Sequence, residues 1–292
     1  MSALRMLTAT IAVVLILLLT VILAIGQPAQ PPIEVAFTTA RIPLDVIKAQ
    51  SAFQKAAART IPLIPQTLIR PFGGGTVKEV RIRALHDGAM IYIELSWADP
   101  TRNATPRRQT EFTDAAALQW PAQPEGLPNP FMGDPRQPVN IWQWKASWQD
   151  ELAQVRDLRA AYPAMSVDYY YDTRFLQDEA ARRAFNAGAA AGNLLSLPTR
   201  ASAVEDLAAW GFGTLTTQPH QDVVGFGAWQ SGRWTVLLAR PLRTQDPADV
   251  QFRPGETAFV NFAVWDGGNR DRNGQKNVTL TWWPLRLQPA AR

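Results

Sequence analysis

The chain has 292 residues and a formal net charge of +4, from 29 basic residues, mostly arginine, against 25 acidic residues. It has no cysteine and two histidines, which excludes disulfides, covalently attached haem, thiolate-bound iron–sulfur clusters, cysteine zinc sites and a three-histidine zinc site. The arginines are scattered, without a basic helix or an aromatic RNA-binding motif, so no nucleic-acid partner is expected.

The chain begins with an apolar run at residues 6–25, after Arg5, and a proline-rich linker follows up to residue 32. Twenty apolar residues can cross a bilayer core of about 30 Å, and the apolar region of a cleaved signal is usually shorter. A retained transmembrane anchor is favoured over a cleaved signal helix. Either one predicts an exported body, in the periplasm or at the outer face of the cytoplasmic membrane. Residues 33–292 then form the folded domain.

Most later segments alternate apolar and polar residues, which is typical of strands. The clearest hairpin joins residues 77–84 and 89–97 through the turn at Asp87 and Gly88. Other strands are predicted at residues 33–40, 114–120, 139–146, 225–229, 233–242, 256–265 and 277–287. Residues 150–200 have helical spacing and are interpreted as an insertion. The fold class is therefore all-β, an antiparallel β-sandwich with a partly helical insertion, preceded by one transmembrane or signal helix.

Common catalytic templates are absent from the sequence. There is no Gly-x-Ser-x-Gly elbow, phosphate-binding loop, dinucleotide fingerprint or His-Glu-x-x-His motif. Four aspartates, Asp99, Asp114, Asp134 and Asp266, lie in or beside predicted turns, where capping is a commoner role than paired-carboxylate catalysis. An enzyme that acts alone is not expected.

Several short motifs occur in order along residues 77–287. They include Asp87-Gly-Ala-Met-Ile-Tyr-Ile-Glu-Leu-Ser-Trp97, Phe131-Met132-Gly133, Ile141-Trp-Gln-Trp144, Gly227-Ala-Trp229 and Asn273-Gly-Gln-Lys276-Asn-Val-Thr-Leu-Thr-Trp282. This ordered set resembles the haem-binding gamma subunits of ethylbenzene dehydrogenase, dimethylsulfide dehydrogenase, and the selenate, chlorate and nitrite oxidoreductases.

The resemblance implies a β-sandwich that holds one haem b between a methionine and a lysine. By position these are Met132 and Lys276, the two axial ligands of the haem iron. A lysine amine binds iron only when neutral, and burial in an apolar pocket lowers its pKa in that direction. From the residues alone, three other ligands stay open, namely Lys145, His86 and His220.

The resemblance also implies a function. The chain is expected to be a b-type cytochrome subunit that relays electrons between the iron–sulfur clusters of a molybdenum oxidoreductase complex and a soluble or membrane electron carrier. Its partners would be a molybdopterin-containing catalytic subunit and an iron–sulfur subunit, and the chain itself would not be catalytic. Two alternatives remain, a carbohydrate- or ligand-binding β-sandwich without haem and a stand-alone membrane-anchored cytochrome b.

Overall fold

The computed structural model of the chain describes residues 30–123, 126–153, 162–166, 178, 180, 187–197 and 200–290. The chain divides into two compact units, Met1–Pro31 and Pro32–Arg292. The predicted anchor at residues 6–25 lies outside the described residues. Within the described ranges, no helix is long and apolar enough to cross a membrane.

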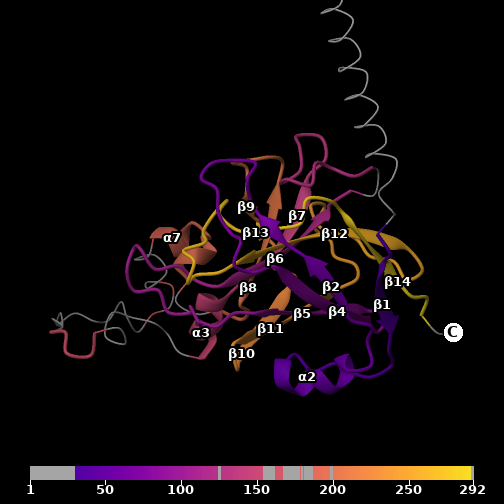
Figure 1. The fold of residues 1–292 in the computed structure, drawn as a ribbon, viewed down its shortest axis with the longest axis horizontal. Helices are drawn as coiled ribbons and strands as arrows, with labels where there is room; N and C mark the ends of the chain where they lie inside the picture. Colours follow the sequence, from indigo (N-terminus) through magenta and orange to yellow (C-terminus); the bar gives the residue numbers. More distant parts are fainter. Residues whose placement is uncertain are drawn as a thin grey trace, which may run out of the picture. The chain divides into compact units, whose positions relative to one another are not determined.

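The unit Pro32–Arg292 is built on one continuous β-sheet (Figure 1). Its strand order is β10 (Val224–Gln230), β11 (Arg233–Pro241), β5 (Met90–Ala98), β4 (Glu79–His86), β1 (Ile33–Phe37), β14 (Trp283–Leu287), β12 (Thr257–Trp265), β6 (Ala115–Pro121), β7 (Val139–Lys145), β8 (Val204–Ala209) and β9 (Thr216–Thr217). Three short strands pair beside this path: β2 (Arg59–Pro62), β3 (Ile64–Pro65) and β13 (Asn277–Val278). β1 is parallel to both of its neighbours, and the other pairs are antiparallel.

Strand β12 divides the sheet into two layers. Its residues 257–260 pair with β14, whereas residues 261–265 pair with β6. We call β10, β11, β5, β4, β1 and β14 layer A, and the second half of β12 with β6, β7, β8 and β9 layer B. The layers pack face to face, because the Trp144 ring of β7 lies 6.1 Å from Trp97 of β5 and 4.9 Å from Trp234 of β11. The fold is thus a β-sandwich made from one folded sheet.

The space between the layers is filled by large apolar side chains from alternate strand positions. On layer B these include Leu118, Trp120, Trp142 and Trp144, all fully buried. Burying a tryptophan removes roughly 150–250 Å² of side-chain surface from water, so these residues account for much of the stability of the core.

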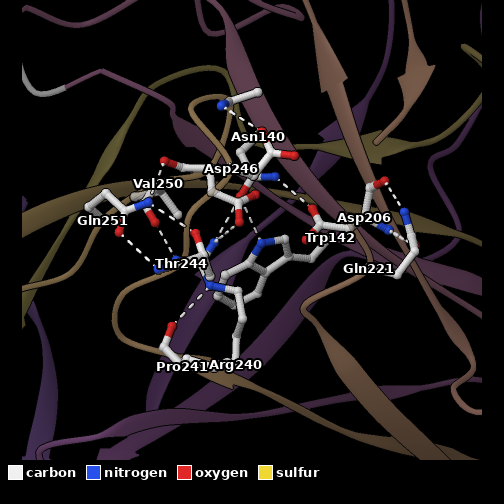
Figure 2. Close-up of polar contacts among 12 residues, drawn as sticks. Asn140, Trp142, Asp206, Gln221, Arg240, Pro241, Thr244, Asp246, Val250 and Gln251 are labelled. Atoms are coloured by element: carbon white, nitrogen blue, oxygen red, sulfur yellow. Dashed lines mark hydrogen bonds and ion pairs between the residues drawn. The ribbon is translucent and has the colours of Figure 1, made fainter. Parts of the chain in front are cut away.

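A buried polar network lies inside this apolar core (Figure 2). Asn140 of β7 donates to Asp206 of β8 over 2.7 Å and accepts from the Trp142 indole over 2.8 Å. Arg240 of β11 lies with its guanidinium 5.0 Å from the Trp142 ring and 3.6 Å from Asp249. The network therefore links layer B to layer A and to the loop after β11.

Short helices lie outside the sandwich. Helix α2 (Val46–Phe53) is capped by Asp45, which accepts two backbone N–H groups, and packs Phe53 against the outside of layer A. Helix α3 (Ala146–Ala153) continues directly from β7, and α7 (Ala187–Ala190) and the 3₁₀ turn η1 (Leu194–Ser196) follow later in the chain. Most of the predicted insertion at residues 150–200 lies outside the described residues.

The strand predictions agree with the structure in most places. The predicted hairpin at residues 77–97 is the β4–β5 pair, and Gly88 turns the chain with φ 91°. The single strand predicted at residues 277–287 was wrong, because residues 279–282 leave the sheet and separate β13 from β14. This break places Trp282 and Trp283 on different clusters: Trp283 enters the core between the layers and Trp282 packs on the outer face of layer B.

Candidate functional site

The outer face of layer B, turned away from layer A, has small and polar side chains near its centre. The four strands are in register, so their side chains form rows across the sheet. One row is Asn261, Gln119, Ile141 and Leu207, and the next is Ala263, Ala117, Gln143 and Glu205. Ala117 and Ala263 are adjacent and have small side chains. The centre of this face is therefore recessed and leaves room for a ligand.

Four loops rise around this floor and enclose a cavity of about 360 Å³. They contribute Leu68 and Ile69, then Pro130, Phe131 and Met132, then Phe212, Gly213 and Leu215, and finally Asn273, Gly274 and Lys276. The lining is mostly apolar, and the volume lies within the range of about 300–1,000 Å³ that small-molecule and cofactor sites have.

Hydrogen bonds fix these loops to the floor and to one another. The carbonyl of Pro130 accepts from the Gln119 side chain over 2.8 Å and from the Asn261 side chain over 3.1 Å. The Gln66 side chain donates to Gly274 over 3.0 Å, and its backbone N–H donates to the Lys276 carbonyl over 2.9 Å. The cavity walls are therefore held in place without a ligand.

Met132 lies in the loop between β6 and β7, in a backbone conformation that is uncommon for methionine. Its φ is +70°, which is uncommon for a residue other than glycine, asparagine or aspartate. The following residue, Gly133, also has positive φ (73°), and a Cβ there would come within 2.9 Å of the Gln137 carbonyl. Gly211 donates to the Met132 carbonyl over 2.8 Å. The half-buried Met132 side chain packs on the outer face of layer B and lines the cavity.

Lys276 lies on the other loop of the cavity, just before β13. Its amine is 4.7 Å from the Trp265 ring centroid, and among the described residues Lys276 is the only charged one in the lining. Burial lowers the pKa of the Lys276 amine to about 8, so the amine loses its proton far more readily than an exposed lysine does. The structure thus brings the two predicted ligands, Met132 and Lys276, to one cavity.

The loop that carries Lys276 is held by residues that the sequence patterns did not single out. The buried Asp271 accepts from the Gly74 N–H over 3.1 Å and from the Asn277 side chain over 3.2 Å. Asn277 in turn accepts from Gly75 and donates to Val264. An aspartate and an asparagine six residues apart in a polar loop match no known sequence motif. These hydrogen bonds could therefore be recognised only in the folded structure.

The alternative ligands lie elsewhere, and none of them is among the residues that line the cavity. Lys145 forms an ion pair with Glu205, and its amine is 4.2 Å from the Trp148 ring. His86 is fully buried and bonded to the Gln288 carbonyl over 2.8 Å, and burial lowers its pKa. His220 is exposed in a loop.

The tryptophans are mostly structural, as the alternation of the strands predicts. Of the 11 in the chain, only Trp210, at 38% exposure, is an exposed side chain. The described structure therefore shows no surface of several exposed tryptophans.

The arrangement offers a thioether and a readily neutralised amine to an apolar cavity. Its lining has no carboxylate, histidine, cysteine or serine that could act as a general acid, a general base or a nucleophile. A thioether and a neutral amine can both act as metal ligands, and the thioether suits a soft metal.

Comparisons with known proteins agree with the motif pattern. The profile of a family described as ethylbenzene dehydrogenase matches residues 50–277. The chain is similar to the chlorate reductase subunit gamma of Ideonella dechloratans, at 28% identity over 80% of this chain and 78% of the relative. It is also similar to a candidate respiratory nitrate reductase haem subunit of Haloferax mediterranei, at 24% identity over 96% of this chain and 83% of the relative.

A third relative is the dimethylsulfide dehydrogenase subunit gamma of Rhodovulum sulfidophilum, at 24% identity over 89% of this chain and 80% of the relative. Among solved structures, a family 9 carbohydrate-binding module of Caldicellulosiruptor kristjanssonii aligns over 89% of this chain and 97% of its own, with a TM-score of 0.40 and 9% identity.

Proposed function

The chain belongs to the ethylbenzene dehydrogenase family, and from this premise we propose that it is a haem-binding electron-transfer subunit. Met132 and Lys276 would be the two axial ligands, and the haem would be of the b type, because the chain has no cysteine to attach it covalently.

One observation carries this proposal: Lys276 is the only charged residue in an apolar cavity that also presents a methionine. An ammonium in an apolar lining without a counterion is costly, and the lowered pKa of about 8 makes the neutral, metal-binding form of the amine easier to reach than in an exposed lysine. A lysine with only a structural role would gain more from a carboxylate partner, as Lys145 does with Glu205.

The residues present fit a haem in three further respects. The lining is apolar, as a porphyrin face requires, and the alanine pair of the floor leaves space for a flat ring. The loops of Met132 and Lys276 are fixed by hydrogen bonds, so both ligands are held before the cofactor arrives. Met132 and Lys276 would fill both axial positions, which leaves no open coordination site for substrate.

When bound, haem supplies one-electron redox chemistry, and the protein sets its environment. The thioether of Met132 is a soft donor that favours the ferrous state, so a fairly high reduction potential is expected. The apolar lining keeps water away from the ring and so favours the state of lower charge.

We extend the proposal to partners and location. Two of the relatives are named as gamma subunits of reductase and dehydrogenase enzymes, which supports a role as a non-catalytic subunit. The chain would pass electrons between the iron–sulfur subunit of a molybdenum enzyme complex and a soluble or membrane carrier. Residues 1–32 would hold the exported domain, residues 33–292, at the outer face of the cytoplasmic membrane.

Visible spectroscopy of the full chain tests the proposal. We expect the wild type to bind one haem and to show a low-spin b-type spectrum in both the oxidised and the dithionite-reduced state. Met132→Leu and Lys276→Leu should each shift the spectrum toward high spin, because each removes one axial ligand.

Met90→Leu and Lys145→Gln are the controls, since these residues are also half-buried but lie outside the cavity. They should keep the low-spin spectrum. A colourless wild type after addition of haem, or a low-spin spectrum that survives both cavity variants, would contradict the proposal.

A further inference from the structure

Three strand ends meet at residues that do not themselves line the cavity. Asp99 follows β5, Asp114 precedes β6 and Asp266 follows β12, and all three are buried. One carboxylate oxygen of each lies within 4.8 Å of those of the other two. We call these residues the acidic cluster, and we propose that it binds one calcium ion.

The first argument is charge. In the part of the chain that the structure describes, no lysine, arginine or histidine forms an ion pair with any of the three carboxylates. Buried charges in proteins are paired or bind metals, and a cation would supply the missing charge.

The second argument is an oxygen without a partner. Asp99 is 1% exposed. Its Oδ1 accepts from the N–H and the hydroxyl of Thr101 over 3.1 Å and 3.4 Å, whereas its Oδ2 accepts no hydrogen bond of normal geometry from the described residues. A buried acceptor of this kind is costly unless something else fills the position. The Asp114 carboxylate, in contrast, is oriented by the N–H groups of Asn103 and Gly267 and by the Trp234 indole.

The third argument is the space beside Gly268. A Cβ on this glycine would lie 2.8 Å from Thr101 Oγ1, 3.1 Å from Asp266 Oδ1 and 3.2 Å from Asn103 Oδ1. Two neutral oxygens, of the Thr101 hydroxyl and the Asn103 amide, therefore lie beside a carboxylate of the acidic cluster, and the hydroxyl donates to the amide oxygen over 2.7 Å. The absence of a side chain at Gly268 keeps this space open.

The donor set indicates which ion fits. All of these atoms are hard oxygen donors, which suit calcium or magnesium rather than zinc or copper. Calcium takes six to eight oxygens at about 2.3–2.6 Å, so oxygens on opposite sides of one ion are about 5 Å apart, as in the acidic cluster. Calcium also accepts irregular geometry, which a set of loop residues supplies more readily than an octahedron.

Such an ion would tie together parts of the chain that are distant in sequence. Asp266 opens the loop that ends at Lys276, and Asp271 in the same loop accepts from Gly74 and Asn277. Calcium would fasten the start of that loop to the ends of β5 and β6. The inference stands apart from haem binding, because none of the three carboxylates lines the cavity.

The test is calcium binding by the full chain after treatment with a chelator. We expect isothermal titration with calcium chloride to give a stoichiometry of one. Addition of about 1 mM calcium should raise the melting temperature by about 5 °C, and the same concentration of magnesium should raise it much less. Neither readout depends on haem.

Asp99→Asn keeps the shape of the side chain and removes one charge. It should weaken calcium binding by about tenfold or more. In the calcium-free state, the variant should melt at or above the melting temperature of the calcium-free wild type, because repulsion within the acidic cluster is smaller. Asp206→Asn is the matched control: Asp206 is also 1% exposed and also has an oxygen without a partner, but it lies in the other buried network. It should leave calcium binding unchanged.

Three results would overturn the inference. The wild type could show no heat of binding and no change in melting temperature, which would mean that the acidic cluster holds protons in place of a cation. Calcium and magnesium could raise the melting temperature equally. Asp99→Asn could bind calcium as tightly as the wild type does.

Discussion

The two faces of layer B come from the same strands, yet one face is packed in the core and the other lines a cavity. The inner face presents Leu118, Trp120, Trp142 and Trp144 and is closed against layer A. The outer face presents Ala117, Gln119, Ile141 and Gln143, and these line a cavity. Adjacent residues of one strand thus serve stability and ligand binding separately, because the pleat sends them to opposite sides.

This division means that the site can change with little effect on the core. A substitution on the outer face alters the cavity floor, whereas its neighbour on the inner face alters the packing between the layers. Stability and haem binding should therefore respond to different members of each adjacent pair.

The largest difference is expected at positions 141 and 142. Trp142→Ala should lower the free energy of unfolding by about 3–5 kcal/mol or more, because it opens a cavity in the core and removes contacts of Asn140 and Arg240. Ile141→Ala should cost less, about 2 kcal/mol, at the low end for a buried isoleucine, since Ile141 already borders open space. Denaturant unfolding of the haem-free chain measures both, and equal losses would refute the division.

The next difference is expected when side chains are enlarged. Ala116→Leu should destabilise the chain by about 1–3 kcal/mol, because Ala116 is fully buried in the packed core. Ala117→Leu should cost less than about 1 kcal/mol in the haem-free chain, since its side chain would extend into the cavity. The same variant should bind haem poorly, which a haem titration would show. A full haem complement in Ala117→Leu would mean that the cavity floor is not the binding surface.

A pH dependence is also expected on the inner face. Burial, with the charge of Asp249, raises the pKa of Asp206 to about 8, far above that of an unfolded aspartate. Between about pH 5 and pH 8 the folded state holds a proton that the unfolded state has lost, so Asp206 makes stability fall as pH rises. Asp206→Asn should remove this slope. Unfolding measured at both ends of the range checks it, and a parallel decline in both proteins would assign the slope to other groups.

The sequence allowed the strands to be predicted where one face is apolar and the other is not. Residues 89–97 and 256–265 alternate clearly and form β5 and β12. Strand β8 was missed, because Val204–Ala209 is buried on both faces and its sequence, with Glu205 and Asp206 in the middle, shows no period-two pattern. The parallel pairing of β1 was also missed, since local alternation says nothing about which distant strand lies alongside.

The site was predictable only in part and for a related reason. Met132 and Lys276 could be proposed from ordered motifs, and the structure places both at one cavity. The floor of that cavity depends on the register between β12, β6 and β7, which brings Ala263 beside Ala117 and Gln143. Asp99, Asp114 and Asp266 were interpreted as turn residues, and their clustering could not be predicted because it depends on how the three strand ends meet.

The way β12 joins the two layers has a consequence for how the chain folds. β14, the neighbour of β12 in layer A, pairs in turn with β1, so Ile33 lies opposite Leu285 across 252 positions of sequence. Contacts of such long range are slow to form, because the intervening chain must first be brought together. Hairpins such as β4–β5 and β10–β11 can form early, but the two halves of the sheet join only when β12 and β14 are in place. Folding should therefore be limited by the pairing of β12 and β14, and the cavity, whose floor includes β12, should be complete only after this step.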